Sequence, residues 1–273
     1  MVNGYRPASL QEALEIKNNI NTVVPYAGGT DLMVENREGV SYLFLNGLEE
    51  LKQIKEEEDH ISIGAGVTFT QALGSDLIQP LMKEAVSRIA APAIRNTGTF
   101  GGNIGNGSAK ADSVLIFYVC DAKLRLASVQ GERLIDINDF YIGRKKLNLR
   151  PDELIVEILI PKKGLDNYYY KKVGGRNALA ISRVAFAGLI SIEEGRIKNM
   201  AAAFGAVSDT VLRFQDLEDM ITGKTLEEAK AVKEKLLAAY EERMVLTRGR
   251  VSAEYRKTVC MNLFKDFLEE KGI

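Results

Sequence analysis

The sequence has 273 residues, of which 46% are hydrophobic and 27% charged, and its 36 basic and 37 acidic side chains leave a formal net charge of −1. This balance excludes the basic footprint of a nucleic-acid-binding protein and the polybasic patch of a membrane-surface protein. No apolar run approaches the roughly 18 residues of a membrane-spanning helix, and the start of the sequence lacks the basic-then-apolar pattern of a signal peptide, so we expect a cytoplasmic protein.

The first half of the chain mixes short strands and helices. Ser9 and Glu12 have capping-box spacing, and apolar residues at helical spacing follow, which predicts a helix that begins at Leu10. A second helix is expected over residues 81–90 and is ended by Pro92. Strands are expected at residues 23–27, 42–45, 61–65, 123–127, 134–137 and 154–160. The pattern predicts a mixed α+β fold.

The second half of the chain follows a different order, and we place a domain boundary near residue 164. Three extended segments come first, at residues 168–173, 184–192 and 197–204. Two strongly helical segments follow, at residues 226–242 and 252–270. Strands followed by helices predict a small sheet covered on one face by helices.

Two glycine-rich segments carry the main functional signal. The first, Tyr-Ala-Gly-Gly-Thr-Asp at residues 26–31, lies between a predicted strand and a predicted helix. The second, residues 97–108, holds five glycines among small polar residues. Glycine lets backbone N–H groups approach an anion closely, and a helix start adds unpaired donors, so the two segments together predict a diphosphate site. For either segment alone, a flexible hairpin or a crowded turn is the alternative.

Neither segment matches a common nucleotide fingerprint, because no Gly-x-Gly-x-x-Gly occurs. The nearest P-loop lookalike, residues 218–225, has Glu218 where the first glycine belongs. A helix end at Gly223 and a capping box from Thr225 to Glu228 explain that stretch structurally.

The sequence has too few cysteine and histidine residues to build a metal site. The chain has two distant cysteines, Cys120 and Cys260, and a single histidine, His60. A structural zinc centre or an iron–sulfur cluster needs about four such ligands. We therefore expect this polypeptide to hold no metal.

With these motifs in view, the sequence resembles the FAD-binding subunits of the xanthine dehydrogenase family of molybdenum hydroxylases over essentially its whole length. The family's first flavin loop, Ala-Gly-Gly-Thr-Asp-Leu, stands at residues 27–32, and its second, Thr-x-Gly-Gly-Asn-Ile, stands at residues 99–104. The flanking residues 91–96 and 106–113 look most like bacterial xanthine dehydrogenase flavin subunits. That likeness favours a purine hydroxylase over the carbon monoxide and nicotinate enzymes.

The resemblance implies a two-part FAD-binding domain of the PCMH type over residues 1–164, α/β in about residues 1–55 and α+β in 56–164. A C-terminal α+β domain with a three-stranded sheet and helices, like that of CO dehydrogenase flavoproteins, would follow over residues 165–273.

The resemblance also implies the cofactor contacts. The FAD diphosphate would be held by Pro25, Tyr26, Ala27, Gly28, Gly29, Thr30, Asp31 and Leu32. The second loop would add Thr99, Gly101, Gly102 and Asn103. Asp112 matches a cofactor-contacting aspartate, with a helix N-cap as the alternative, and Ile89 and Ile155 match apolar flavin neighbours that could also be core. Lys172 matches a lysine near the flavin, although Lys171 leaves that assignment uncertain by one residue.

The resemblance implies an electron-transfer subunit. A partner subunit would carry molybdopterin and hydroxylate the substrate, a second partner would relay electrons through two [2Fe-2S] clusters, and this chain would pass them from FAD to NAD⁺. A dimer of heterotrimers is expected, and no catalytic side chain is assigned. The alternatives are a stand-alone FAD oxidoreductase of the same superfamily and a non-redox nucleotide-binding module.

Overall fold

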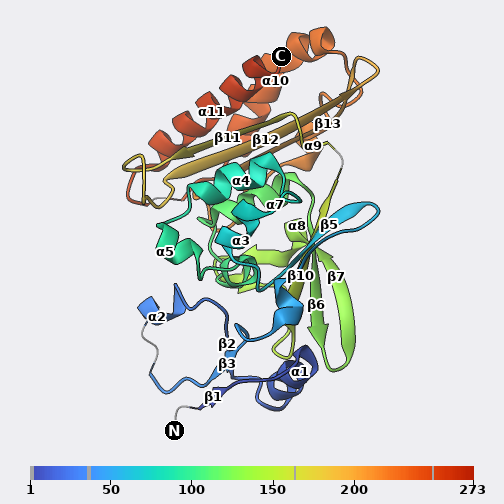
Figure 1. The fold of residues 1–273 in the computed structure, drawn as a ribbon. Helices are drawn as coiled ribbons and strands as arrows, with labels where there is room; N and C mark the ends of the chain where they lie inside the picture. Colours follow the sequence, from blue (N-terminus) through green and yellow to red (C-terminus); the bar gives the residue numbers. More distant parts are fainter. Residues whose placement is uncertain (1–2, 36–37, 163, 248) are drawn as a thin grey trace. The chain divides into compact units, whose positions relative to one another are not determined.

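The computed structural model describes residues 3–35, 38–162, 164–247 and 249–273 (Figure 1). These residues form two compact units, each assembled from three separate stretches of the chain. The described residues of unit 1 fall within Met1–Ile78, Ala90–Gly107 and Asp121–Pro161. Those of unit 2 fall within Gln79–Ile89, Ser108–Cys120 and Lys162–Ile273.

Unit 1 begins with a small parallel sheet of order β1-β3-β2, made of β1 (Gly4–Tyr5), β2 (Val24–Tyr26) and β3 (Tyr42–Phe44). Helix α1 (Leu10–Asn19) connects β1 to β2. Its start is fixed by Ser9, whose hydroxyl accepts a hydrogen bond from the Glu12 N–H at 3.2 Å. The predicted α/β opening is confirmed by these elements.

A larger antiparallel sheet of order β4-β5-β10-β6-β7 forms the rest of the framework of unit 1 within the described residues. Its strands are β4 (Ile54–Glu56), β5 (His60–Gly64), β6 (Lys123–Ser128), β7 (Gly131–Asp136) and β10 (Leu154–Pro161). β10 is central and almost continuously apolar, with Ile158 and Ile160 fully buried. Buried residues of α1, β3 and β10, among them Leu14, Leu43 and Leu154, join both sheets in one core.

Short elements complete unit 1. They are α2 (Leu32–Glu35), the 3₁₀ turn η1 (Glu49–Lys52), α3 (Phe69–Gly74), α5 (Pro92–Arg95), α6 (Phe100–Gly105), α8 (Ile137–Phe140), β8 (Tyr141–Gly143) and β9 (Lys146–Leu147). β8 and β9 form a hairpin.

Unit 2 is built on an antiparallel sheet of order β11-β12-β13-β14. Its elements are β11 (Tyr168–Val173), β12 (Val184–Glu193), β13 (Arg196–Gly205), β14 (Leu212–Arg213), α4 (Pro80–Ser87), α7 (Asp112–Val119), α9 (Gln215–Glu218), α10 (Leu226–Arg243) and α11 (Ala253–Glu270). The three long strands and the two long helices confirm the prediction for the C-terminal part, and β14 adds two residues at the edge of β13.

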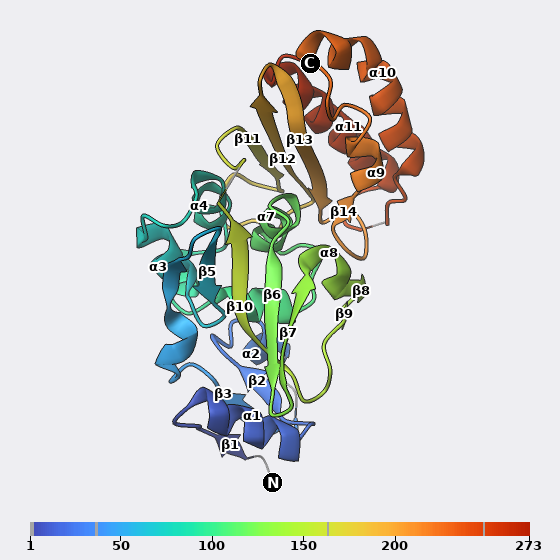
Figure 2. The same ribbon diagram turned by 90° about the vertical axis from the view of Figure 1, so that its right-hand side faces the viewer.

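The sheet of unit 2 has helices on both faces, where the sequence predicted one covered face (Figure 2). On one face a Cβ at Gly188 would lie 2.8 Å from the Phe267 ring of α11. On the other face a Cβ at Gly205 would lie 3.7 Å from Leu115 of α7. The second layer comes from α4 and α7, which precede the strands in the chain, so the strands-then-helices order could not indicate it.

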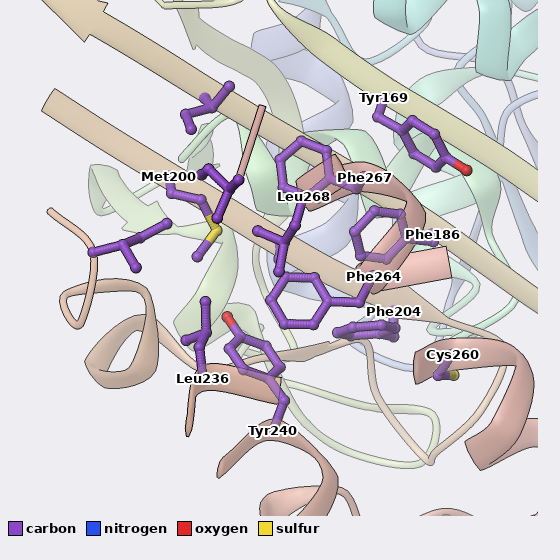
Figure 3. Packing of buried hydrophobic residues seen from close by; sticks show 14 of the residues in the cluster. Tyr169, Phe186, Met200, Phe204, Leu236, Tyr240, Cys260, Phe264, Phe267 and Leu268 are labelled. Carbon is purple, nitrogen blue, oxygen red and sulfur yellow. The ribbon is translucent and has the colours of Figure 1, made fainter. Parts of the chain in front are cut away.

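Aromatic rings fill the core between the sheet and the two long helices of unit 2 (Figure 3). Phe186 and Phe204 of the sheet lie 5.0 Å apart, and Phe264 of α11 lies 4.3 Å from Tyr240 of α10, measured between ring centroids. Such tilted pairs add about 0.5–1.5 kcal/mol each beyond their burial. On the opposite side of the sheet, all eight residues of α7 are buried.

Candidate functional site

Unit 1 contains a cavity of about 390 Å³. Its walls come from both glycine-rich segments, from the central strand β10 and from the turn between β8 and β9. Binding pockets for organic ligands span about 300–1,000 Å³. The cavity therefore has the size of a small-molecule site, or of one part of a longer ligand.

The first glycine-rich segment offers unused hydrogen-bond donors to this cavity. Within the described part of the chain, the backbone N–H groups of Gly28, Gly29, Thr30 and Asp31 have no protein acceptor. All four residues line the cavity. Helix α2, which follows, is only four residues long, so its dipole contributes little and the donors belong to the loop itself. A row of such donors suits an anionic oxygen-rich ligand.

Glycine is required at both positions of the Gly28-Gly29 pair, for different reasons. A Cβ at Gly28 would lie 1.9 Å from the backbone carbonyl oxygen of Thr97, at the start of the second segment. Gly29 has φ +68, and a Cβ there would lie 2.1 Å from the Tyr26 hydroxyl. Gly28 thus lets the first segment lie directly on the second, and Gly29 lets the first segment turn closely over its own Tyr26.

The second glycine-rich segment, predicted as a loop, folds in part as the short helix α6. The N–H groups of Phe100 and Gly101 donate to backbone carbonyls at 3.1 and 2.8 Å, and that of Gly102 donates to Thr99 Oγ1 at 3.0 Å. Thr99 is the N-cap, and a Cβ at Gly101 would lie 2.6 Å from the Ala65 side chain. Close packing and capping therefore outweigh the low helix propensity of glycine, and these backbone donors are used internally.

Side-chain contacts also join the two segments. The Asn106 amide donates to the Asp31 carboxylate at 2.7 Å. Gly102 approaches Ala27, since a Cβ there would lie 3.8 Å from the Ala27 side chain. The structure thus brings together the two segments that the sequence predicted to share one ligand.

Two ion pairs lie in the wall of the cavity. Lys145, in the turn between β8 and β9, pairs with Glu35 of α2 at 2.9 Å. Glu153, 4% exposed, pairs with Arg133 at 2.6 Å and also accepts from the Arg150 N–H. Burial by itself raises the pKa of Glu153, but the hydrogen bonds from Arg133 and Arg150 outweigh burial, so its pKa lies below 4.5.

Most of the residues that the resemblance implied as cofactor contacts line the cavity. Twelve of the sixteen line it, namely Pro25, Ala27, Gly28, Gly29, Thr30, Asp31, Leu32, Thr99, Gly101, Gly102, Asn103 and Ile155. Tyr26 does not; its ring packs against Phe44, with centroids 4.9 Å apart. Sequence reasoning missed Glu35 and Lys145, because a charged residue beside a turn is usually solvated surface.

The remaining three predicted residues, Ile89, Asp112 and Lys172, belong to unit 2. Asp112 and Lys172 form a buried ion pair at 2.7 Å, with side chains 7% and 9% exposed. Asp112 also accepts from the Ser182 hydroxyl at 2.6 Å, a partner that sequence reasoning missed. The alternative reading of Asp112 as a helix N-cap is wrong, because Ala111 holds that position.

Lys171 and Lys172 have different surroundings within unit 2. Lys171 is exposed and places its ammonium group 5.5 Å from the centre of the Tyr169 ring, on the other side of the strand from Lys172. Tyr170 lies on the same side as Lys172, and burial, followed by the negative charge of Asp112, raises its pKa well above 10. Lys172 is therefore the lysine of a buried polar cluster.

Comparisons with known proteins give the family. The protein-family model described as the FAD binding domain in molybdopterin dehydrogenase matches residues 1–163. The family model of the CO dehydrogenase flavoprotein C-terminal domain matches residues 168–271. The chain belongs to the FAD-binding subunits of the molybdenum hydroxylases. The family membership and the fold class predicted for this FAD-binding subunit are thereby confirmed.

Several curated relatives of this FAD-binding subunit match over nearly the full length. The xanthine dehydrogenase FAD-binding subunit of Escherichia coli O157:H7 is 30% identical, with 97% of this chain and 94% of the relative covered. The nicotinate dehydrogenase FAD-subunit of Eubacterium barkeri is also 30% identical, with 96% and 93% covered. Because these identities are equal, the comparisons do not choose a substrate.

Solved structures agree with this assignment. A chain of the reconstituted CO dehydrogenase from Oligotropha carboxidovorans superposes with a TM-score of 0.89 at 25% identity, with 98% of this chain and 96% of that chain covered.

Among the described residues of the FAD-binding subunit, every helix is too short or too polar to span a bilayer. In the same residues, no three His, Cys, Asp or Glu side chains cluster as metal ligands would.

Proposed function

We propose that the cavity of unit 1 holds the diphosphate and adjoining parts of FAD. The observation that carries this proposal is the row of four N–H donors without protein acceptors, at Gly28, Gly29, Thr30 and Asp31. The donor set fits the group, because a diphosphate presents several acceptor oxygens and no donors. A side chain at Gly28 would collide with the Thr97 carbonyl group of the second segment, so the position of these donors depends on glycine there.

The rest of the lining fits the remainder of a dinucleotide. Thr99 and Asn103 supply a hydroxyl and an amide for ribityl or ribose oxygens, and Phe69, Leu154 and Ile155 supply apolar surface for a ring system. When bound, FAD supplies two-electron redox chemistry. The chain's own residues bind and orient it, and we assign no proton transfer to any side chain.

We further propose the place of the chain in a larger enzyme. Electrons would come from [2Fe-2S] clusters of a small partner subunit, after a molybdopterin-bearing large subunit has hydroxylated a purine such as xanthine, and NAD⁺ would be the acceptor. The names of the relatives, FAD-binding subunit and medium chain, support a multi-subunit assembly. We propose a cytoplasmic dimer of such heterotrimers, with the FAD-binding domain at residues 1–164 and the second domain at 165–273.

Native isolation tests the assembly. We expect this chain to co-purify with molybdenum- and iron-containing polypeptides and to carry FAD with a flavin absorption spectrum. Isolation of the chain by itself, active with a substrate, would instead favour the stand-alone oxidoreductase. A colourless chain that takes up no FAD would overturn the proposal.

The acceptor and the substrate have separate tests. With the isolated complex, we expect xanthine-dependent reduction of NAD⁺ to proceed at a rate comparable to reduction of an artificial dye. Dye reduction without NAD⁺ reduction would contradict the acceptor. Activity with nicotinate and none with purines would contradict the substrate.

A further inference from the structure

The charges around the cavity are unequal. Among the described residues that line it, three carry carboxylates, Asp31, Glu35 and Glu153, and one carries a cation, Lys145. Glu153 is neutralised by Arg133, and Asp31 accepts from Asn106. Within the described lining, Lys145 therefore supplies the positive charge that a dianionic diphosphate would meet.

The backbone of Lys145 is held in a fixed position. It lies in the turn between β8 and β9 with φ +52, a conformation that favours glycine or asparagine over lysine. A Cβ at Gly107, just after α6, would lie 3.0 Å from the Lys145 Cα, so the turn rests against the end of the second glycine-rich segment. This contact with the second glycine-rich segment sets the position of the turn, and with it that of Lys145.

In the structure, Lys145 forms an ion pair with Glu35. The Lys145 ammonium group donates to Glu35 Oε1 at 2.9 Å, with the side chains 56% and 27% exposed. The pair connects α2, at the first glycine-rich segment, with the turn at the end of the second. Because the pair is partly exposed, exchanging Glu35 for another anion costs little.

We propose that Lys145 binds the diphosphate of FAD and that Glu35 is an internal competitor for the same ammonium group. This inference rests on the proposed FAD site. A diphosphate carries more negative charge than one carboxylate and also binds the four loop donors, so it displaces Glu35 from Lys145. Glu35 then lowers the affinity for FAD, while Lys145 raises it.

The first experiment replaces the cation. The full chain, stripped of flavin, is titrated with FAD while the quenching of flavin fluorescence is followed. Lys145→Met is expected to raise the Kd about tenfold or more, as loss of a charge-assisted hydrogen bond does. Lys146→Met removes the same charge one residue later, outside the cavity lining, and is expected to leave the Kd within about twofold.

The second experiment replaces Glu35. Whether the Kd for FAD falls or rises distinguishes a competitor for Lys145 from a purely structural ion-pair partner. Glu35→Gln is expected to lower the Kd for FAD about two- to fivefold, because a partly exposed ion pair no longer has to be broken. A purely structural pair predicts the opposite, weaker binding from both Glu35→Gln and Lys145→Met. Glu38→Gln, a nearby carboxylate outside the lining, serves as the matched control.

Riboflavin, which lacks phosphate, distinguishes the proposed role of Lys145 from the proposed FAD site. Under the inference, Lys145→Met weakens FAD binding and leaves riboflavin binding unchanged. Equal losses for both ligands, or an unchanged Kd for FAD, overturn the role of Lys145 and leave the FAD site standing. Failure of the unaltered chain to bind FAD overturns the proposed function itself.

Discussion

Gly28→Ala is the substitution that most directly tests the contact between the two glycine-rich segments. The new Cβ would lie 1.9 Å from the Thr97 carbonyl oxygen, and non-bonded carbon and oxygen atoms approach no closer than about 3 Å. The two backbones must therefore separate by about 1 Å, since no side-chain rotation can relieve a contact with the main chain. Overpacking of this kind costs about 1–3 kcal/mol or more. We expect a loss of at least about 2 kcal/mol in unfolding free energy.

The same displacement moves the donors of residues 28–31 away from the proposed diphosphate. Losing one or two hydrogen bonds to a charged group costs about 1.5–3 kcal/mol each, so the Kd for FAD is expected to rise about 10- to 100-fold or more. Urea unfolding and FAD titration of the full chain measure both effects. Gly47→Ala, where a Cβ would meet nothing within 4 Å, is the control. If Gly28→Ala matched the unaltered chain in both stability and affinity, the described contact would be wrong.

Three further predictions concern the buried polar groups, and they use four substitutions. Glu153→Gln breaks the pair with Arg133 and is expected to cost about 3 kcal/mol at pH 7; because the folded pKa of Glu153 lies below 4.5, that deficit shrinks as the pH falls below about 4.5. Lys172→Met leaves Asp112 buried without its cation and is expected to cost about 3–5 kcal/mol, much of which Asp112→Asn restores in the double variant. Tyr240→Phe removes a buried hydroxyl that has no hydrogen-bond partner in the described structure and is expected to stabilise by about 1 kcal/mol.

Urea unfolding measures all three, with pH 7 and pH 3.5 compared for Glu153→Gln. A deficit for Glu153→Gln that is the same at both pH values would contradict the lowered pKa. Strictly additive losses in the Lys172 and Asp112 variants would show that the two groups do not interact. A clear destabilisation by Tyr240→Phe would mean that the hydroxyl has a partner after all.

The elements that the sequence predicted are those with strong periodicity or clear caps. The helices from Leu226 and from Ala253, and the long strands of unit 2, follow directly from the apolar pattern and from N-caps at Thr225 and Ser252. The second glycine-rich segment is recognisable because five glycines in twelve residues have no other common use than a turn or a close approach. Local sequence is therefore enough to indicate this part of the cavity wall.

The rest depends on contacts between distant residues. Glycine content favours a loop at residues 100–105, and a helix forms there because Thr99 caps it and Gly101 packs against the distant Ala65. The pair of Asp112 with Lys172 spans 60 residues, and that of Glu35 with Lys145 spans 110, so no local pattern announces either. The resemblance to a family could supply Asp112 and Lys172, but it supplied nothing for Glu35 and Lys145.

The interleaving of the two units limits how this polypeptide can be divided. A fragment that ends after Pro161 would keep α7, all of whose residues are buried, but would lose β12 and β13, against which α7 packs. Such a fragment would present an apolar helix to water and would tend to aggregate. Exchange of halves between relatives, by recombination or by engineering, must therefore transfer α4 and α7 together with the C-terminal sheet, and a single crossover point cannot achieve this.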